Sequence, residues 1–200
     1  MNPEAGPAAA GTRRVGSRPS AGERFVSTRR IAAVALGALV VSVAAQFAVP
    51  VPLSPVPMTL QPLAVLAVGG LLGAVGGASA LVLYIVLGAL GLPVFAGGGA
   101  GPLHLIGPTG GYLLAFPVAA GLTGALVTRG PSSVLRVLLT CALGMVIIHL
   151  GGVAQLALLG GDPALAFRVG FLPFLTGDLL KVGLAAAVIL AGGPRIRSLL

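Results

Sequence analysis

The chain has 200 residues; 56% of them are hydrophobic, 8% are charged, and the mean hydropathy is +1.07. Soluble domains carry about 25% charged residues, so this composition excludes a soluble domain and indicates a polytopic membrane protein. The formal net charge of +8 does not indicate nucleic-acid binding, because six of the twelve basic residues lie between Arg13 and Arg30 rather than over a folded face. We therefore expect a lipid bilayer, and no nucleic acid, as a partner.

The N-terminal residues 1–28 are rich in Ala, Gly, Pro, Ser and Arg and lack apolar periodicity. This composition predicts a disordered basic tail. A cleaved signal peptide is the alternative, but the charged region is too long and the apolar run 31–49 is long enough to span a bilayer. We expect a disordered tail at 1–28, a transmembrane domain at 29–193 and a short tail at 194–200.

Six membrane spans are expected at about 20 residues per crossing, which predicts an all-α six-helix bundle. They lie at 30–49, 59–76, 78–94, 110–128, 134–158 and 173–192, and Gly76–Gly77 forms the tight connection between the second and the third. The basic N-terminal tail, the loop with Arg129 and the C-terminal arginines would all lie on one side, and Arg168 on the other. By the positive-inside rule, both termini then face the cytoplasm across the cell membrane.

Two outer loops have unusual compositions. The loop at 49–57 is apolar and contains four prolines, which fix φ and forbid helix, so we expect a stiff extended segment that packs on the bundle as a lid. The loops at 93–101 and 107–112 are rich in glycine, which lets the backbone approach a ligand closely. Such loops are also common as plain connectors.

The last span contains two charged residues, Asp178 and Lys181, three positions apart and therefore on one helix face. A lone charge in hydrocarbon costs about 2.5 kcal/mol or more, so the pair is a functional-site hypothesis. A carboxylate accepts and an ammonium donates hydrogen bonds, so together they suit a urea or amide ring. The alternative is an internal ion pair that only fixes the rotation of the helix. Polar residues at the same depth in other spans favour a site: Thr59, Gln61, Thr109 and Tyr112.

Other chemistry is poorly supported. His149 lies within the fifth span, where a satisfied buried histidine is the simpler interpretation, and His104 lies in an outer loop where it is solvated. Two isolated histidines make a metal site improbable, and no hydrolase serine motif or phosphate-binding P-loop occurs. Cys141 stands alone in an apolar run and is expected to fill the core. We predict no cofactor and no ATP hydrolysis by this chain.

The first span contains two small-xxx-small pairs, Ala33…Gly37 and Ala38…Ser42, which would permit close helix contact. Their spacing does not decide between another span of the same chain and a separate subunit.

Four motifs occur in order along the chain: VPLSPVPMTLQ at 51–61, LYIVLGALGLPVFAGG at 83–98, GPTGGYLL at 107–114 and PFLTGDLLK at 173–181. With these motifs the chain resembles the BioY family, the biotin-specific substrate-binding (S) components of energy-coupling-factor (ECF) transporters. The likeness runs from about residue 30 to residue 189.

The resemblance implies a six-helix S-component that binds biotin near the outer face, under the loop that follows the first span. It also implies a transmembrane coupling protein and two ATPase subunits as partners. Asp178 and Lys181 would contact the biotin head group, and the remaining site residues would line the pocket: Thr59, Gln61, Phe95, Gly97, Gly98, Thr109, Gly110 and Tyr112. The chain departs from the family at 73–77, where basic residues are usual, and at His149, where an aromatic residue is common.

The predicted function is high-affinity capture of biotin for import, not catalysis. A small intramembrane enzyme that uses Asp178 and Lys181 as acid and base is the alternative. A channel subunit would instead require a polar stripe along several helices, whereas the polar residues here gather at one depth.

Overall fold

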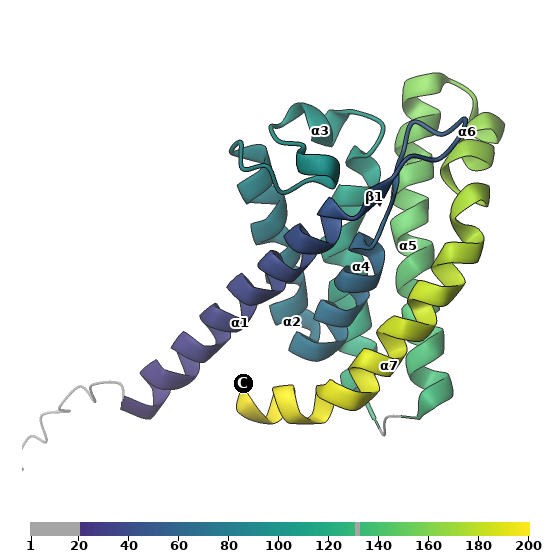
Figure 1. Cartoon of the computed structure of the whole chain (residues 1–200). Helices are drawn as coiled ribbons and strands as arrows, with labels where there is room; N and C mark the ends of the chain where they lie inside the picture. The colour runs from purple at the N-terminus through teal and green to yellow at the C-terminus, as the bar shows by residue number, and fades with distance from the viewer. Residues whose placement is uncertain (1–20, 131–132) are drawn as a thin grey trace, which may run out of the picture.

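The computed structural model describes residues 21–130 and 133–200 and shows long helices packed into one bundle (Figure 1). Within these residues, five helical stretches are long and apolar enough to cross a membrane. They centre on α1 (Ala21–Gln46), α2 (Gln61–Ala89), α4 (Gly110–Thr128), α5 (Val134–Gly160) and α7 (Leu175–Leu199). A helix satisfies its backbone polar groups within its own segment, which hydrocarbon requires. The predicted all-α membrane fold is confirmed.

The helix α2 reverses direction at Gly73, whose φ of 77° and ψ of −178° are not helical. Glycine reaches such angles because it has no Cβ. A Cβ on Gly77 would lie 2.7 Å from the Cα of Gly69, so the two arms of α2 pack against each other as a hairpin (Figure 1). These arms are the second and third predicted spans. The predicted connection at Gly76–Gly77 is wrong, because both glycines are helical and the turn lies at Gly73.

The ends of the bundle differ from the predicted domain boundaries. α1 begins at Ala21, so the expected boundary after residue 28 falls inside a helix, and residues 1–20 of the predicted tail lie outside the described residues. α7 continues to Leu199 and includes most of the predicted tail at 194–200. Its last turns run across the end of the bundle (Figure 1), where Arg197 Nη1 donates to the Gly70 carbonyl at 2.6 Å.

The proline-rich loop covers the end of the bundle opposite to the C-terminal turns of α7. β1 (Ala48–Val49) pairs with β2 (Met58–Thr59) in an antiparallel ladder, so the loop folds back on itself. Val56 is 7% exposed and belongs to the main hydrophobic core, whereas Leu53 is 95% exposed. One side of the loop therefore packs on the bundle, in agreement with the predicted lid-like segment.

Short helices complete this end of the bundle: η1 (Ala96–Gly98), α3 (Leu103–Ile106), α6 (Pro163–Gly170) and η2 (Leu172–Phe174). Asp162 caps α6, because its side chain accepts hydrogen bonds from the backbone N–H groups of Ala164 and Leu165. Figure 1 places α3, α6 and β1 at the same end of the bundle. The connections there are thus built from structured elements.

Small residues let the long helices approach one another closely. A Cβ on Gly69 would clash with the backbone of Ala120 on α4, and one on Gly111 would clash with the backbone of Gly151 on α5. On α1, Gly37 faces Val68 and Ala80 of α2. The structure therefore answers the open question about the small residues of the first span: Gly37 packs within the chain.

Candidate functional site

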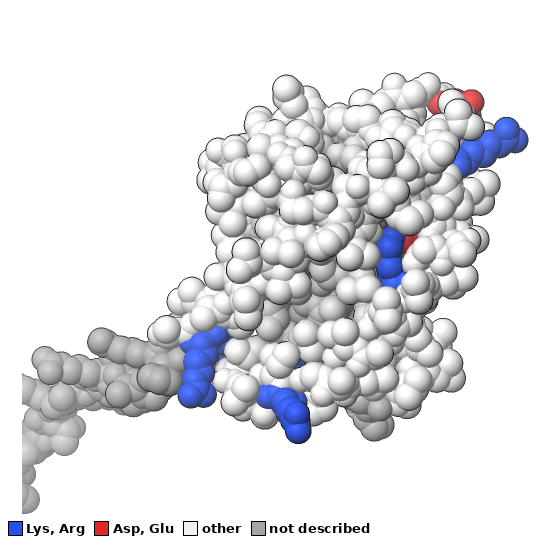
Figure 2. Space-filling model, in the orientation of Figure 1, with Lys and Arg blue, Asp and Glu red and all other residues white. Residues whose placement is uncertain are grey.

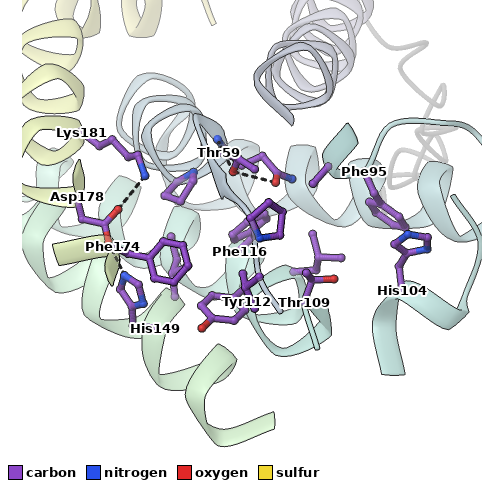
Figure 3. Close-up of a pocket in the computed structure, with 17 residues that line it drawn as sticks. Thr59, Phe95, His104, Thr109, Tyr112, Phe116, His149, Phe174, Asp178 and Lys181 are labelled. Atoms are coloured by element: carbon purple, nitrogen blue, oxygen red, sulfur yellow. Dashed lines mark hydrogen bonds and ion pairs between the residues drawn. The ribbon is translucent and has the colours of Figure 1, made fainter. Parts of the chain in front are cut away.

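A cavity of about 250 Å³ lies between the long helices at the end covered by the proline-rich loop. Its wall is contributed by α2, α3, α4, α5, α7, η1, η2 and the loop. The lining residues are Val56, Pro57, Thr59, Gln61, Pro62, Phe95, Ala96, His104, Thr109, Tyr112, Leu113, Phe116, Ile148, His149, Phe174, Asp178 and Lys181. Most of these are apolar, and the charged groups are concentrated at one end (Figure 3).

The charged end is formed by the first turns of α7. Lys181 Nζ donates to Asp178 Oδ1 at 2.9 Å, and the two residues are 6% and 5% exposed. Their spacing of three residues places both side chains on the same helix face, as the sequence predicts. Figure 2 shows the other charged side chains of one molecular face at its two ends, and a single blue and red pair in a hollow between them.

His149 on α5 contacts the second oxygen of this carboxylate. The distance between His149 Nε2 and Asp178 Oδ2 is 2.5 Å, and the other ring nitrogen, Nδ1, lies 3.2 Å from the Gly170 carbonyl oxygen. His149 is 7% exposed. Both oxygens of Asp178 are therefore held, one from its own helix and one from α5.

Aromatic rings enclose this cluster. The ring of Tyr112 lies edge-on to His149 at a centroid distance of 6.0 Å, and that of Phe171 lies edge-on at 5.0 Å. Phe174 is 6.0 Å from His149 in a tilted arrangement. The Tyr112 hydroxyl donates to the Gly170 carbonyl at 2.6 Å, so this carbonyl joins Tyr112 and His149. The rings therefore pack around the imidazole that holds Asp178.

A second polar cluster joins β2 to the two arms of α2. Gln61 Nε2 donates to the Tyr84 hydroxyl at 2.6 Å, and the Thr59 hydroxyl donates to Gln61 Oε1 at 3.1 Å. The edge of Phe95 packs on the ring of Tyr84 at 5.6 Å, and Phe95 is 1% exposed. This network fixes Thr59 and Gln61 in the wall while the rest of the wall stays apolar.

The chemistry that this cavity supports is recognition of a small ligand with both donors and acceptors. The cavity of about 250 Å³ lies just below the range of about 300 to 1,000 Å³ that is usual for ligand sites, and like them it is mostly apolar with a few polar groups, so it suits one small molecule. Among the described residues there is no group of three His, Cys, Asp or Glu side chains that could hold a metal ion.

The sequence matches the model of the BioY family over residues 17–198. The chain belongs to the BioY family. A probable biotin transporter BioY of Pyrococcus horikoshii is 40% identical over 166 residues, which cover 83% of this chain and 96% of that protein. The biotin transporter BioY of Thermotoga maritima is 41% identical over 140 residues, 70% of this chain and 82% of that protein. The resemblance inferred from the four motifs is confirmed.

The fold of this BioY-family chain is similar to the crystal structure of the S-component for biotin from an ECF-type ABC transporter. The TM-score is 0.79, and the likeness covers 90% of this chain and 95% of that chain at 22% sequence identity. At this identity the likeness shows a shared fold.

In this BioY-family chain the structure brings most of the predicted site residues to one cavity. Seven line it: Thr59, Gln61, Phe95, Thr109, Tyr112, Asp178 and Lys181. Gly97, Gly98 and Gly110 do not. Gly97 and Gly98 adopt positive φ values of 64° and 80° and form the turn of η1 that positions Phe95. Gly110 packs against the Leu105 carbonyl and the side chain of Gln155, so its missing Cβ serves helix packing.

Two cavity residues were assigned other roles from the sequence. His149 was predicted to be a satisfied buried histidine; it is satisfied, and it also lines the cavity and holds Asp178. His104 was predicted to be solvated, but its Nδ1 is buried without a hydrogen-bond partner, and the residue lines the cavity beside Phe95. The sequence signal for His149 as a site residue was its position as a polar residue within an apolar run. Its contact with Asp178 could not be predicted, because Asp178 lies 29 residues further along the chain.

Proposed function

We propose that this chain is the biotin-binding S-component of an ECF-type uptake transporter and that biotin occupies the cavity beside Asp178 and Lys181. One observation carries the proposal: a buried, joined carboxylate and ammonium open onto a mostly apolar cavity within a membrane bundle. Membership of the BioY family and the named biotin transporters among its relatives support it. The family is one of transporters, so the enzymatic alternative is set aside.

The polar end of the cavity suits the ureido ring of biotin. Asp178 accepts one hydrogen bond at each oxygen, but a carboxylate offers about four acceptor positions, so both oxygens can accept further N–H groups. Lys181 has three donors, of which Asp178 uses one, leaving donors for a ligand oxygen. A cyclic urea presents N–H groups beside a carbonyl oxygen and therefore matches this pair.

The remaining wall suits the apolar parts of biotin. Phe116, Phe174 and Ile148 face the cavity from three different elements and would pack on the thiophane ring and the valeryl chain. Val56 and Pro57 of the proline-rich loop close the cavity on the outer side. Biotin would therefore enter from outside and be covered by this loop.

The partners and orientation follow from the same assignment. The sequence contains no P-loop motif for binding ATP, so the energy for import would come from a transmembrane coupling protein and two ATPase subunits. Arg129 and the arginines at the α7 end lie at the end of the bundle away from the cavity, which by the positive-inside rule supports an orientation in the cell membrane with both termini in the cytoplasm.

Calorimetry on the purified chain tests the function. Biotin should bind with a stoichiometry of one and without chemical turnover, and desthiobiotin, which keeps the ureido ring and lacks the sulfur, should also bind. A preparation that remains folded but binds neither compound would contradict the proposal. Chemical conversion of either compound would favour the enzymatic alternative.

A further inference from the structure

His104 of the short helix α3 lines the cavity at the end away from the charged cluster. Figure 3 shows its ring beside Phe95 on one side of the cavity, whereas Asp178 and Lys181 lie on the other side. Thr109 lies between the two sides. The cavity therefore has a polar residue at its far end that takes no part in the contacts of Asp178.

The Nδ1 atom of His104 is buried, and among the described residues it has no hydrogen-bond partner. Buried polar side-chain atoms are hydrogen-bonded in the large majority of cases, so one that lacks a partner requires an explanation. The other such atom in the described part of the chain is the hydroxyl oxygen of Thr123, a residue that does not line the cavity. A buried nitrogen without a partner in a cavity wall is the arrangement expected of a group that bonds to a ligand.

The imidazole of His104 is held in place by three contacts. The ring of Phe95 lies 5.5 Å away in a tilted arrangement. A Cβ on Gly99 would lie 2.5 Å from His104 Nε2, so this part of the ring packs against the backbone of Gly99. Gln155 of α5 donates from Nε2 to two backbone carbonyls of the α3 segment, at 3.1 and 2.6 Å. The ring is therefore ordered before a ligand binds, which lowers the entropic cost of a contact with it.

Biotin is polar at both ends, with the ureido ring at one end and a carboxylate at the end of the valeryl chain. With the ureido ring beside Asp178 and Lys181, the chain would extend through the apolar middle of the cavity toward His104. A carboxylate that leaves water needs hydrogen-bond donors in its place. A neutral imidazole has one N–H, which can be at Nδ1 without an additional proton on the ring. A carboxylate only accepts hydrogen bonds, so its presence would select that tautomer.

We infer that His104 is a specificity-determining residue whose Nδ1–H donates a hydrogen bond to the valeryl carboxylate of biotin. The inference rests on the proposed function, because it requires biotin with its ureido ring beside Asp178. The charged cluster then recognises the ring of the ligand, and His104 recognises its tail. These contacts lie on opposite sides of the cavity, so a ligand that lacks either polar group binds more weakly.

Calorimetry in detergent micelles with two ligands tests this contact. The ligands are biotin and an analogue in which a methyl group replaces the carboxylate. The wild-type chain should bind biotin more tightly by about tenfold or more, the contribution of a hydrogen bond to a charged group. His104→Leu removes the donor, so the Kd for biotin should rise by about the same factor and the Kd for the analogue should not change. Lost packing on Phe95 would raise both Kd values alike, so the ratio of the two isolates the hydrogen bond.

The variant His104→Asn separates the donor from the shape of the side chain. Asparagine is close to leucine in shape, and its amide nitrogen lies near the position of the imidazole Nδ1 and can donate. This variant should therefore keep the preference for biotin that His104→Leu loses. Leu103→Ala is the control on the same helix, because Leu103 is 73% exposed and should leave both Kd values unchanged.

An equal preference for biotin in the wild type and in His104→Leu would overturn the inference and leave the proposed function intact. Equal Kd values of the wild type for the two ligands would also overturn it. If His104→Leu does not fold, His104→Gln replaces it: its amide extends to the position of Nε2, so it should lose the preference, and a retained preference would overturn the inference. A folded wild-type chain that binds neither ligand would instead contradict the proposed function.

Discussion

Asp178 on α7 is bonded through one oxygen to Lys181 of the same helix and through the other to His149 of α5. The carboxylate therefore links two helices that the sequence separates by 29 residues. Breaking this link affects both the ligand cavity and the packing of α5 on α7, so binding and stability need separate measurements.

The Asp178→Asn variant should bind biotin about 5- to 150-fold more weakly, which corresponds to about 1 to 3 kcal/mol. The amide keeps the size of the side chain but removes the negative charge, so it accepts weaker hydrogen bonds from a ureido ring. The Kd is measured by calorimetry. Asp162→Asn is the matched control, since this residue is exposed and Asn caps a helix as well as Asp does. Equal Kd values for the two variants would contradict the assignment.

Thermal unfolding in detergent should distinguish the effects of one lost charge from those of two. Asp178→Asn leaves Lys181 buried without a carboxylate, and removal of one partner of a buried pair costs about 3 to 5 kcal/mol. Adding Lys181→Met removes the unpaired ammonium, so the double variant should unfold at a higher temperature than Asp178→Asn. If the loss of stability in the double variant equals the sum of the losses in the two single variants, the two side chains are not energetically coupled.

The Gly152→Ala variant should weaken biotin binding by displacing Tyr112. A Cβ at Gly152 would clash with the Tyr112 ring, which lines the cavity. Such overpacking costs about 1 to 3 kcal/mol of stability. Gly160→Ala on the same helix is the control, because no atom lies within 4 Å of its added Cβ. Thermal unfolding and the biotin Kd should change in the first variant and stay near wild type in the second.

The proline-rich loop is tested at its two faces. Val56→Ser removes apolar contacts from a buried position at the cavity and should weaken binding by about 1 to 2 kcal/mol. Leu53→Ser changes a side chain that is 95% exposed and should not alter the Kd. Faster dissociation of biotin from the first variant, measured by stopped-flow fluorescence with a labelled ligand, would support the loop as a cover. Identical dissociation rates in the two variants would contradict it.

The turn of α2 depends on one glycine. Gly73→Ala places a Cβ on a residue with φ 77° and ψ −178°, a conformation that costs about 1 to 3 kcal/mol for other residues. No atom lies within 4 Å of that Cβ, so the loss of stability would come from backbone strain. The control is Gly183→Ala, which has the same open surroundings without a positive φ. Thermal unfolding that is equal in both variants would show that the turn tolerates a side chain.

Local features of the site could be predicted from the sequence. The shared face of Asp178 and Lys181 follows from a spacing of three residues on one helix. The convergence of Thr59, Thr109 and Tyr112 followed from their depth, because each lies at the outer end of an apolar run. The glycines were less predictable: Gly97 and Gly110 belong to glycine-rich stretches of the sequence but serve a turn and helix packing, which composition does not distinguish from ligand contact.

The sequence by itself determined that this chain is a helical membrane bundle with one charged pair, because hydrophobicity and residue spacing act along a single segment. Only the tertiary structure decided which helices meet: it placed His149 against Asp178, turned α2 at Gly73 and closed the cavity with Val56. The physical reason is that the rotation of a helix and the helix it packs against depend on contacts between segments far apart in the sequence. The residue spacing within one helix does not indicate which other helix it contacts.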